Sequence, residues 1–496
     1  MMAQQAMSGR PLLDQLFAGI GAAPPIAVTD VTLDSRRVTP GSLFLACQGH
    51  EHHGLEFLDQ ALAAGAVAIA YEPRDDLPVV TGKAVAVPVT DLRTQLGRLA
   101  RRFFADPSAQ LHTSAITGTN GKTTVAWLLA GAWHELGRPA GYIGTLGAGV
   151  DSAALSSTGL TTPDVVELSR TLAEFVHDGA EAAALEASSH ALDQDRLAGL
   201  TIDAAVLTNL GRDHLDYHGS HAAYAAAKAK LFARRELAVR VVNGDDAFGA
   251  TLAKRFAGSW QTSKDRTRAG DPRHVVAVDI DASVDGLALD INVAGERVTL
   301  QSPLFGSFNV DNLLSVLAVL ATAGIEPQQA ARALGRVAPP PGRMQRIAGA
   351  SDITVIVDFA HTADALTVAL DALRAHCTGR LICVFGAGGD RDVGKRGPMG
   401  EAVAQRADRF IVTSDNPRSE NPDAIIDDIL RGVPTAVDAM REPDRRTAIE
   451  RAIDLAQADD IVLIAGRGHE TQQIVGDERI PFDDAVVAAA VLEARG

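Results

Sequence analysis

The segment SAITGTNGKTT, which ends at Thr124, has the residue types of a phosphate-binding loop. Gly118 and Gly121 permit a tight backbone, and the helical pattern VAWLLAGAWHELG that follows would offer N–H groups and a positive dipole end to phosphate. Lys122 would meet the β- and γ-phosphates, and the Thr123 hydroxyl would meet Mg²⁺. The general pattern wants a further glycine two residues before Gly118, where isoleucine stands. The alternative is a glycine turn before a surface lysine, but a strand, loop and helix in this order favour a nucleotide site.

A second set of residues has metal-binding chemistry. Glu186 closes an apolar run, where a carboxylate without a partner would be costly. Asp213, His214, Asp216 and His218 crowd one loop, and carboxylates and imidazoles near a nucleotide suit a divalent cation. Each histidine alone is better explained as a surface residue, but the set as a whole, with Glu186 and the loop threonine, predicts a metal site.

Lys228 lies in the helical pattern AAYAAAKAKLF. From composition alone, a solvent-exposed lysine on the face of a helix is the default interpretation. Nothing in the periodicity separates Lys228 from Lys230.

The segment SDNPRSE follows the apolar stretch RFIVT. Pro417 fixes its own φ and keeps the preceding residue extended, so Asp415, Asn416 and Arg418 are presented by a stiff turn. Taken alone, this is ordinary turn chemistry.

The elements that position these residues follow a repeated order. Short apolar runs, several ending in Gly, Asp or Asn, alternate with Ala-rich helical patterns. This order predicts parallel sheets flanked by helices, with ligands at the carboxyl ends of the strands. The predicted strands lie within residues 182–185, 203–210, 240–244, 354–360, 380–389, 409–415 and 460–468.

Two breaks divide the chain. One lies near Asp106 and Pro107, and the other is the three-proline segment before Gly342, which neither a helix nor a central strand could cross. A length of 496 residues suits about three domains. The predicted domains are therefore residues 1–106, 107–342 and 343–496.

Composition narrows the class of protein. Hydrophobic residues make up 46% and charged residues 22%, so the chain can bury large cores. The net charge of −16 argues against non-specific binding to nucleic acid or anionic membranes, although an anionic small substrate remains compatible. Three cysteines without a CxxC pair, no signal-peptide pattern, and apolar runs too short to span a bilayer predict a reduced cytoplasmic enzyme.

Ten motifs, taken together and in this order, resemble the Mur ligase family. They are GTNGKTT, EASSHALDQDR, TNLGRDHLDYHG, YAAAK, FGSFNVDN, PGRMQ, DFAHTADAL, FGAGGDRDVGKR, SDNPR and AGRGHET. The resemblance runs from about Thr32 to Glu470 and is nearest to the branch that adds meso-diaminopimelate. The shorter glycine spacing of the phosphate loop is typical of this family.

The resemblance implies a fold and a reaction. It implies an α/β protein with a smaller N-terminal α/β domain for the UDP end of the substrate. A central P-loop ATPase-like domain with a parallel sheet would bind ATP, and a C-terminal Rossmann-like domain would bind the amino acid. The reaction would be ATP-dependent addition of meso-diaminopimelate to UDP-N-acetylmuramoyl-L-alanyl-D-glutamate through an acyl phosphate, with Mg²⁺, in peptidoglycan precursor synthesis. A cytoplasmic enzyme, expected to be monomeric, would have no nucleic-acid or membrane partner.

Site residues carried over from the resemblance fall into four groups. The catalytic and metal-binding group is Lys122, Thr123, Glu186, His214 and Lys228, the last as a carbamylated N6-carboxylysine. The ATP-binding group is Gly118, Thr119, Asn120, Gly121, Lys122, Thr123, Thr124, Asn309, Asn312, Arg343 and His361. The UDP-substrate group is Leu33, Ser35, His50, Glu51, His52, Leu160, Thr161, Thr162, Ser188, Gln194 and Arg196. The amino-acid group is Arg391, Asp415, Asn416, Pro417, Arg418, Gly466 and Glu470.

The chain departs from the family pattern at Leu160, Phe359, Ala363, Arg467 and Gln472, which puts local contacts in doubt but removes no charge assigned to the chemistry. Three alternatives stay open. They are the same reaction with L-lysine, a folylpolyglutamate synthetase-like ligase, and a nucleotide-dependent switch protein that is not an enzyme. Arg418 favours diaminopimelate, because a guanidinium pairs with the carboxylate that lysine lacks.

Overall fold

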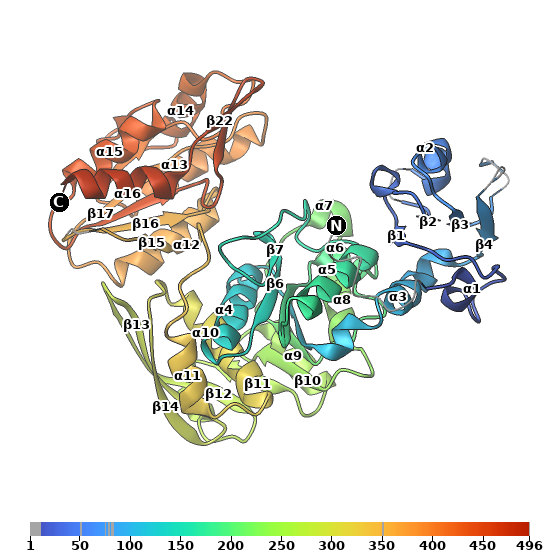
Figure 1. Ribbon diagram of the computed structural model, residues 1–496. Helices are drawn as coiled ribbons and strands as arrows, with labels where there is room; N and C mark the ends of the chain where they lie inside the picture. Colours follow the sequence, from blue (N-terminus) through green and yellow to red (C-terminus); the bar gives the residue numbers. More distant parts are fainter. Residues whose placement is uncertain are drawn as a thin grey trace. The chain divides into compact units, whose positions relative to one another are not determined.

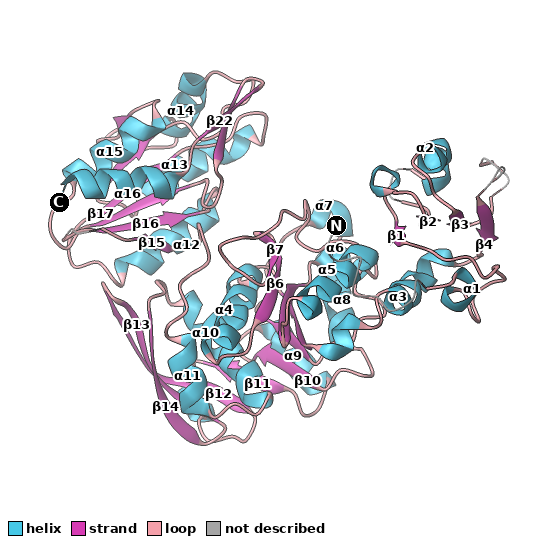
Figure 2. Cartoon of the chain, in the orientation of Figure 1, coloured by secondary structure: helices cyan, strands magenta, loops and turns pink. Residues whose placement is uncertain are grey.

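The structure is a computed structural model that describes residues 11–49, 52–74, 76–77, 80, 84–349 and 352–495. The chain divides into two compact units. Figures 1 and 2 show the helices and strands of the chain. Unit 1 takes Met1–Ala126, Gly137–Val242 and Asp246–Ser259, and unit 2 takes Trp127–Leu136, Asn243–Asp245 and Trp260–Gly496. The division into three domains at 106/107 and 342/343 stays a prediction.

The first part of unit 1 is a small parallel sheet with the strand order β1-β2-β3-β4. Leu43 and Leu45 of β2 share a core with Leu92 and Leu99 of α3, and with Val165 at the start of α5. The elements are α1 (Leu13–Leu16), β1 (Asp30–Thr32), η1 (Ser35–Arg37), β2 (Ser42–Ala46), η2 (Gly54–Phe57), α2 (Leu58–Ala63), β3 (Ala68–Tyr71), β4 (Val85–Pro88) and α3 (Leu92–Phe103), where η is a 3₁₀ helix.

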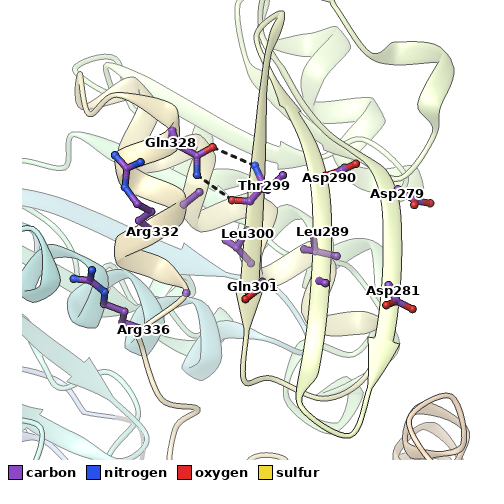
Figure 3. A pocket seen from close by; sticks show the side chains of 13 residues that line it. Asp279, Asp281, Leu289, Asp290, Thr299, Leu300, Gln301, Gln328, Arg332 and Arg336 are labelled. Carbon is purple, nitrogen blue, oxygen red and sulfur yellow. Dashed lines mark hydrogen bonds between the residues drawn. The ribbon is translucent and has the colours of Figure 1, made fainter.

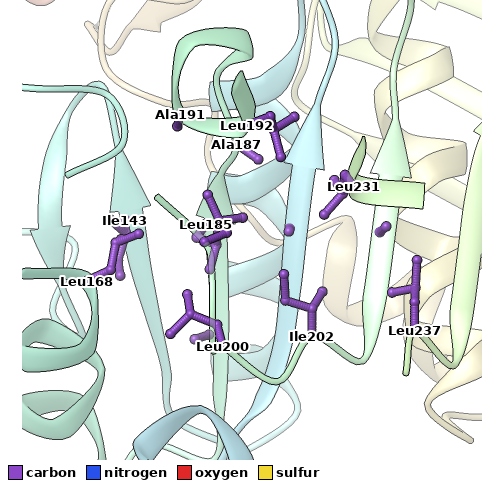
Figure 4. Packing of buried hydrophobic residues seen from close by; sticks show 14 of the residues in the cluster. Ile143, Leu168, Leu185, Ala187, Ala191, Leu192, Leu200, Ile202, Leu231 and Leu237 are labelled. Atoms are coloured by element: carbon purple, nitrogen blue, oxygen red, sulfur yellow. The ribbon is translucent and has the colours of Figure 1, made fainter. Parts of the chain in front are cut away.

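The second part of unit 1 has strands in the order β10-β9-β5-β8-β6-β7, and every pair except β6 with β7 is parallel. Leu185 of β8, Ile143 of β6, Leu168 of α5 and Leu231 of α8 meet in one buried cluster (Figure 4). The elements that lie in it wholly or in part are η3 (Pro107–Gln110), β5 (His112–Thr117), α4 (Lys122–Glu135), β6 (Ala140–Gly144), β7 (Gly147–Gly149), α5 (Val165–His177), β8 (Ala182–Glu186), α6 (Ser189–Asp193), β9 (Ala204–Leu207), α7 (Leu215–His218), α8 (His221–Phe232), β10 (Val239–Asn243) and α9 (Ala247–Arg255).

Unit 2 begins with strands that are mostly antiparallel. β12 pairs with β11 in parallel, but β12, β13 and β14 form consecutive hairpins. The expectation of parallel sheets is therefore incomplete here, because short turns at Asp285 and Gly295 leave no room for a crossover helix. The elements are β11 (Trp260–Ser263), η4 (Arg266–Arg268), β12 (His274–Ser283), β13 (Gly286–Val293), β14 (Glu296–Ser302), α10 (Phe308–Thr322) and α11 (Pro327–Leu334).

The last sheet of unit 2 has the order β15-β16-β20-β17-β18-β19 and is parallel except for β15. Successive strand residues point to opposite faces: Cys383 packs with α12, α13 and α14, whereas Ile382 and Val384 pack with α15 and α16. The elements are β15 (Gln345–Ile347), β16 (Thr354–Asp358), α12 (Ala363–Arg374), β17 (Leu381–Phe385), η5 (Val393–Lys395), α13 (Arg396–Ala404), β18 (Arg409–Val412), α14 (Pro422–Leu430), β19 (Met440–Arg441), α15 (Arg445–Leu455), β20 (Ile461–Ala465), β21 (Gln472–Val475), β22 (Glu478–Pro481) and α16 (Asp484–Arg495).

The predicted strands are confirmed, each within a few residues of its expected bounds, as β8, β9, β10, β16, β17, β18 and β20. Within the described ranges, no helix is long and apolar enough to cross a membrane.

Candidate active site

The phosphate loop joins the end of β5 to the start of α4, as predicted. Gly118 and Gly121 have φ values of 151° and 86°, which glycine adopts at little cost. Asn209, just after β9, shapes the loop: its carbonyl accepts from Thr119 N at 3.0 Å, and its Oδ1 accepts from Asn120 N at 3.0 Å. The sequence assigned no role to Asn209, although it lies near the end of the predicted strand segment 203–210.

Two lysines converge on one carbonyl of this loop. Lys122 Nζ donates to Gly118 O at 3.0 Å and to Thr119 O at 2.9 Å, and Lys228 Nζ donates to Gly118 O at 2.7 Å. Lys228 is 1% exposed. Burial, and then the positive charge of Lys122, lower the pKa of Lys228 to about 6, so that its amine is neutral at pH 7.

The default interpretation of Lys228 as a solvent-exposed lysine is therefore wrong. Lys230 does fit it, because its side chain is 46% exposed and pairs with Asp193 at 3.0 Å. The difference arises because α8 turns Lys228 toward the phosphate loop and over the ring of Tyr224, which lies 4.5 Å from Nζ.

Glu186, at the end of β8, is fully buried beside the loop. Its Oε2 accepts from the Thr123 hydroxyl at 3.0 Å and its Oε1 from the Tyr142 hydroxyl at 2.7 Å. Thr145 adds its N–H at 2.9 Å and its hydroxyl at 3.3 Å. Sequence reasoning missed Tyr142 and Thr145, which lie on and just after the neighbouring strand β6. These donors replace water around the carboxylate, so that a buried charge is tolerated.

The oxygen atoms of Glu186 and Thr123 fit a hard divalent cation. A threonine hydroxyl and a carboxylate oxygen already lie side by side, and such ions prefer oxygen ligands. Lys228 as an amine is a poor Mg²⁺ ligand, whereas its carbamate would present anionic oxygen.

The sequence predicts that the histidine-rich loop contributes to a metal site, and this stays a prediction. In the ranges that the structure describes, no group of three or more His, Cys, Asp or Glu residues is placed to hold a metal. His214 is 45% exposed, and its Nε2 lies 3.4 Å from Asp213. The ring of His190 lies 4.8 Å from His214 and 5.6 Å from His218. Burial lowers the pKa of both His190 and His218, and the charge of His214 acts in the same direction.

A pocket of about 510 Å³ in unit 1 is lined by residues of the predicted UDP-substrate group. Leu33, Leu160, Gln194 and Arg196 line it. Cys47, Gln48, Gly49, Arg93, Asp164, Asp195 and Tyr217 also line it and were not predicted.

The other members of this group lie in hydrogen-bonded loops. The Thr162 hydroxyl donates to Glu186 O at 2.7 Å and accepts from Ser188 N at 3.1 Å. Thr161 Oγ1 lies 3.1 Å from Thr145 Oγ1, and Arg196 Nη1 donates to Thr162 O at 2.7 Å.

Two further described members lie elsewhere in the N-terminal part of unit 1. The Ser35 hydroxyl donates to Gln60 Oε1 at 2.9 Å, and His52 lies 3.0 Å from Glu56. His50 and Glu51 lie outside the described residues.

The ATP-group residues of unit 2 fall into two pairs. Asn312 Nδ2 donates to Asn309 Oδ1 at 2.8 Å, and both side chains are buried on α10. Arg343 lies 4.7 Å over the ring of Phe359, whose ring lies 4.7 Å from that of His361. Phe359, one of the departures, thus has aromatic contacts with both members of the second pair.

The amino-acid group surrounds the turn that follows β18. Asn416 Oδ1 accepts from Ile474 N at 2.9 Å, and its Nδ2 donates to Glu470 Oε2 at 2.7 Å. Arg418 has a φ of 51°, and its Nη1 donates to Gly389 O at 2.7 Å. Gln473 Nε2 donates to Asp415 O at 2.6 Å. The β21–β22 hairpin therefore holds the turn, and most of the Asn416 amide is already engaged.

Two further members of the group lie at neighbouring strand ends. Gly466 follows β20 with a φ of 117°, and a Cβ there would lie 2.6 Å from Asp415 Oδ2, so glycine is required. Arg391 is exposed on the loop after β17.

A buried ion cluster lies beneath this turn. Arg445, Asp484 and Arg467 are all 0% exposed. Arg445 pairs with Asp484 through two bonds of 2.8 and 2.7 Å, and it donates to Ser414 O at 3.2 Å and to Ala465 O at 3.0 Å. Arg445 therefore ties together the ends of β18 and β20, immediately before Asp415 and Gly466.

A second pocket, of about 560 Å³, lies where β12, β13 and β14 meet α11 (Figure 3). Gln328 bonds Thr299 through both ends of its amide, at 3.3 and 3.1 Å. Asp279, Asp281 and Arg332 also line it. None of the described site residues predicted from the sequence lines this pocket.

Three segments of the chain match models of one family. Residues 27–104 match the "Mur ligase family, catalytic domain", residues 116–320 the "Mur ligase middle domain", and residues 342–468 the "Mur ligase, glutamate ligase domain".

Relatives match nearly the whole chain. A protein of Xanthomonas campestris pv. campestris named UDP-N-acetylmuramoyl-L-alanyl-D-glutamate–2,6-diaminopimelate ligase is 48% identical, covering 98% of each chain. A solved structure with that name is 35% identical with a TM-score of 0.76, covering 98% of this chain and 99% of the other. A folylpolyglutamate synthase of Mycobacterium tuberculosis, solved with ADP and AMPPCP, is 19% identical with a TM-score of 0.57, covering 80% of this chain and 93% of the other, which shows a shared fold alone.

Proposed function

This chain belongs to the Mur ligase family, and from that premise we propose that it joins meso-diaminopimelate to UDP-N-acetylmuramoyl-L-alanyl-D-glutamate at the expense of ATP. The observation that carries this proposal is a phosphate loop whose Thr123 bonds the buried Glu186, with two lysines on Gly118 O. This arrangement suits phosphoryl transfer to a carboxylate. The names of relatives that are 44–48% identical over nearly the full chain support the choice of substrates.

The reaction begins with phosphoryl transfer. An oxygen of the D-glutamyl γ-carboxylate attacks the γ-phosphorus of ATP, and the bond from that phosphorus to the bridging oxygen breaks, which gives an acyl phosphate and ADP. Two anions must approach each other, so neutralising charge is the main task of the site. We assign this role to Lys122, and its two bonds to carbonyls of the loop support the assignment.

Amide formation follows. The amino group of diaminopimelate attacks the acyl carbon, a carbon–nitrogen bond forms, the nitrogen gives up a proton, and phosphate leaves. Binding both substrates in line supplies much of the acceleration.

Mg²⁺ is part of the proposal. Thr123, Glu186 and His214 would hold it, together with Lys228 as a carbamate. Bound there, the ion would offset phosphate charge. The neutral Lys228 amine supports this modification, because only an unprotonated amine attacks CO₂.

Selectivity for diaminopimelate is assigned to Arg418 and Glu470. Arg418 is held by Pro417 and by its bond to Gly389 O, which leaves other guanidinium N–H groups for the distal carboxylate of the substrate. Glu470, oriented by Asn416, would hold the distal ammonium. We therefore assign Asn416 to positioning Glu470 rather than to direct substrate contact. The proposed location is the cytoplasm, consistent with three free cysteines in the described residues.

The test is phosphate release from ATP by the purified full chain. Release should require both the muramoyl-dipeptide and diaminopimelate, with L-lysine compared side by side. Lys122→Ala should abolish turnover while circular dichroism stays unchanged. Hydrolysis without either substrate would support a switch protein instead, and equal rates with lysine would refute the proposed selectivity.

A further inference from the structure

We propose that Arg93 binds the diphosphate of the nucleotide-sugar substrate, an inference that rests on the proposed function. Arg93 is the second residue of α3 and lines the 510 Å³ pocket together with Leu33 and Arg196. The family resemblance assigned no role to it.

Arg93 is held at the pocket wall by its neighbours. Its Nη1 donates to Gln48 O at 2.9 Å, and its backbone N–H donates to Glu72 Oε1 at 3.0 Å. The other oxygen of Glu72 accepts from Gln48 N at 3.4 Å. Glu72 thus bonds two backbone groups, and one guanidinium nitrogen of Arg93 is fixed in place.

In the described part of the chain, the guanidinium of Arg93 has no carboxylate partner. Among the residues that the structure describes, neither Arg93 nor Arg196 forms a salt bridge with an acid. The positive charge of Arg93 acts on Arg196. Burial lowers the pKa of Arg196 and the charge of Arg93 lowers it further, whereas the charge of Asp164 raises it. Two guanidinium groups lining one pocket without a paired acid favour an anionic ligand.

Arg93 has more binding capacity left than Arg196. Arg196 donates to Thr162 O through Nη1 and to Gln194 Oε1 through Nε and Nη2, at 2.7, 3.0 and 2.7 Å. Among the described residues, Arg93 uses only Nη1 in a bond to protein, so two adjacent N–H groups stay available for a bidentate contact with phosphate oxygens.

Two acids on the same pocket do not cancel this charge. Asp164 caps α5, where its Oδ1 accepts from Val166 N at 2.9 Å and from Glu167 N at 3.0 Å. Asp195 lies on an exposed turn with a φ of 55°. The Asp164 carboxylate is thus used by the backbone of α5.

The chemistry of the substrate selects the diphosphate. Leu33 was assigned to the uridine end and Arg196 to the muramoyl-peptide end, and both line one pocket. The diphosphate is the covalent link between these ends, so it must lie in that pocket as well. It also carries two negative charges there.

The experiment compares Arg93→Gln with Arg101→Gln, which removes the same charge from the same helix but outside the pocket. Calorimetric titration of the full chain with uridine, UDP and UDP-N-acetylmuramoyl-L-alanyl-D-glutamate separates the parts of the ligand. Arg93→Gln should weaken UDP and the full substrate equally, by roughly tenfold or more, and leave uridine unchanged. Arg93→Lys should keep part of the affinity that Arg93→Gln loses, and Arg101→Gln should bind all three ligands as the wild type does.

Kinetics give a second readout. Arg93→Gln should raise KM for the nucleotide-sugar substrate while kcat and KM for ATP and diaminopimelate stay unchanged. Unchanged UDP binding in Arg93→Gln would overturn the role of Arg93 and leave the proposed function standing. A loss of affinity seen only with the dipeptide substrate, or seen equally with uridine, would do the same. A wild-type chain that binds neither UDP nor the full substrate would overturn the proposed function as well.

Discussion

Burying Lys228 should reduce stability, and replacing it with methionine should reveal by how much. Methionine has a similar length but cannot be protonated, so Lys228→Met removes the titration and keeps most of the packing. We expect Lys228→Met to be more stable than the wild type at pH 7 and inactive in ligation.

The magnitude follows from the lowered pKa. A lysine that titrates near 10.5 when unfolded, and near 6 when folded, is buried as the amine at pH 7. Releasing its proton costs about 1.4 kcal/mol for each of about 3.5 pH units (10.5 minus 7), on the order of 5 kcal/mol. The bond to Gly118 O returns about 1 kcal/mol. Lys228→Met should therefore gain roughly 3–4 kcal/mol in the free energy of unfolding.

The sign of the pH dependence is fixed. Below about pH 6 both folded and unfolded chains carry the proton, and the cost of burial is largest. Between about pH 6 and 10.5 the unfolded chain binds one proton more, so the wild type gains about 1.4 kcal/mol per pH unit relative to Lys228→Met. The cost of releasing the proton should vanish near pH 10.5, where only the contribution of the bond to Gly118 O remains.

Urea unfolding at pH 7, 8 and 9 in CO₂-free buffer measures this difference. All three tryptophans, at positions 127, 133 and 260, lie on α4 and β11, so their fluorescence reports on these elements. Lys230→Met is the matched control from the same helix and should show no such pH dependence. A wild-type to Lys228→Met difference that stays constant with pH would refute a buried neutral amine.

Three further outcomes are expected. Arg418→Lys, which keeps the charge but loses the fork, should reduce the preference for diaminopimelate over L-lysine by at least about tenfold in kcat/KM; an unchanged preference would contradict the assignment. Arg445→Leu should destabilise unit 2 by about 3–5 kcal/mol, because it leaves Asp484 buried without its main partner, and urea unfolding measures the loss. Tyr142→Phe should cost about 1.5–3 kcal/mol through the lost bond to Glu186 and raise the Mg²⁺ concentration needed for half-maximal turnover; unchanged values for both would show that Tyr142 does not support Glu186.

The local sequence was sufficient to predict where strands end and where the phosphate loop lies. Gly118 and Gly121 allow backbone angles that other residues disfavour, and an apolar run before them with a helical pattern after them leaves few alternatives. The β12–β14 hairpins were missed, because the alternation of parallel strand and helix was extended over a segment with short turns.

Side-chain surroundings were not readable in this way, because they depend on residues far apart in the chain. Tyr142 and Thr145 bond Glu186 only because β6 lies beside β8, and Ile474 engages Asn416 only because a hairpin packs on the turn. Arg93 entered no prediction, since its role depends on a pocket that also contains residues of β2 and of the segments flanking α5 and α6.

Lys228 and Lys230 mark the boundary between the two kinds of information. An alanine-rich helix has nearly the same small side chains on every face, so its sequence determines that α8 is a helix but not which face is buried. Packing against the phosphate loop buried Lys228 and left Lys230 in solvent. The sequence by itself determined the family, the position of the phosphate loop and the positions of seven strands along the chain. Only the tertiary structure decided which lysine loses its proton, because desolvation depends on what surrounds the amine.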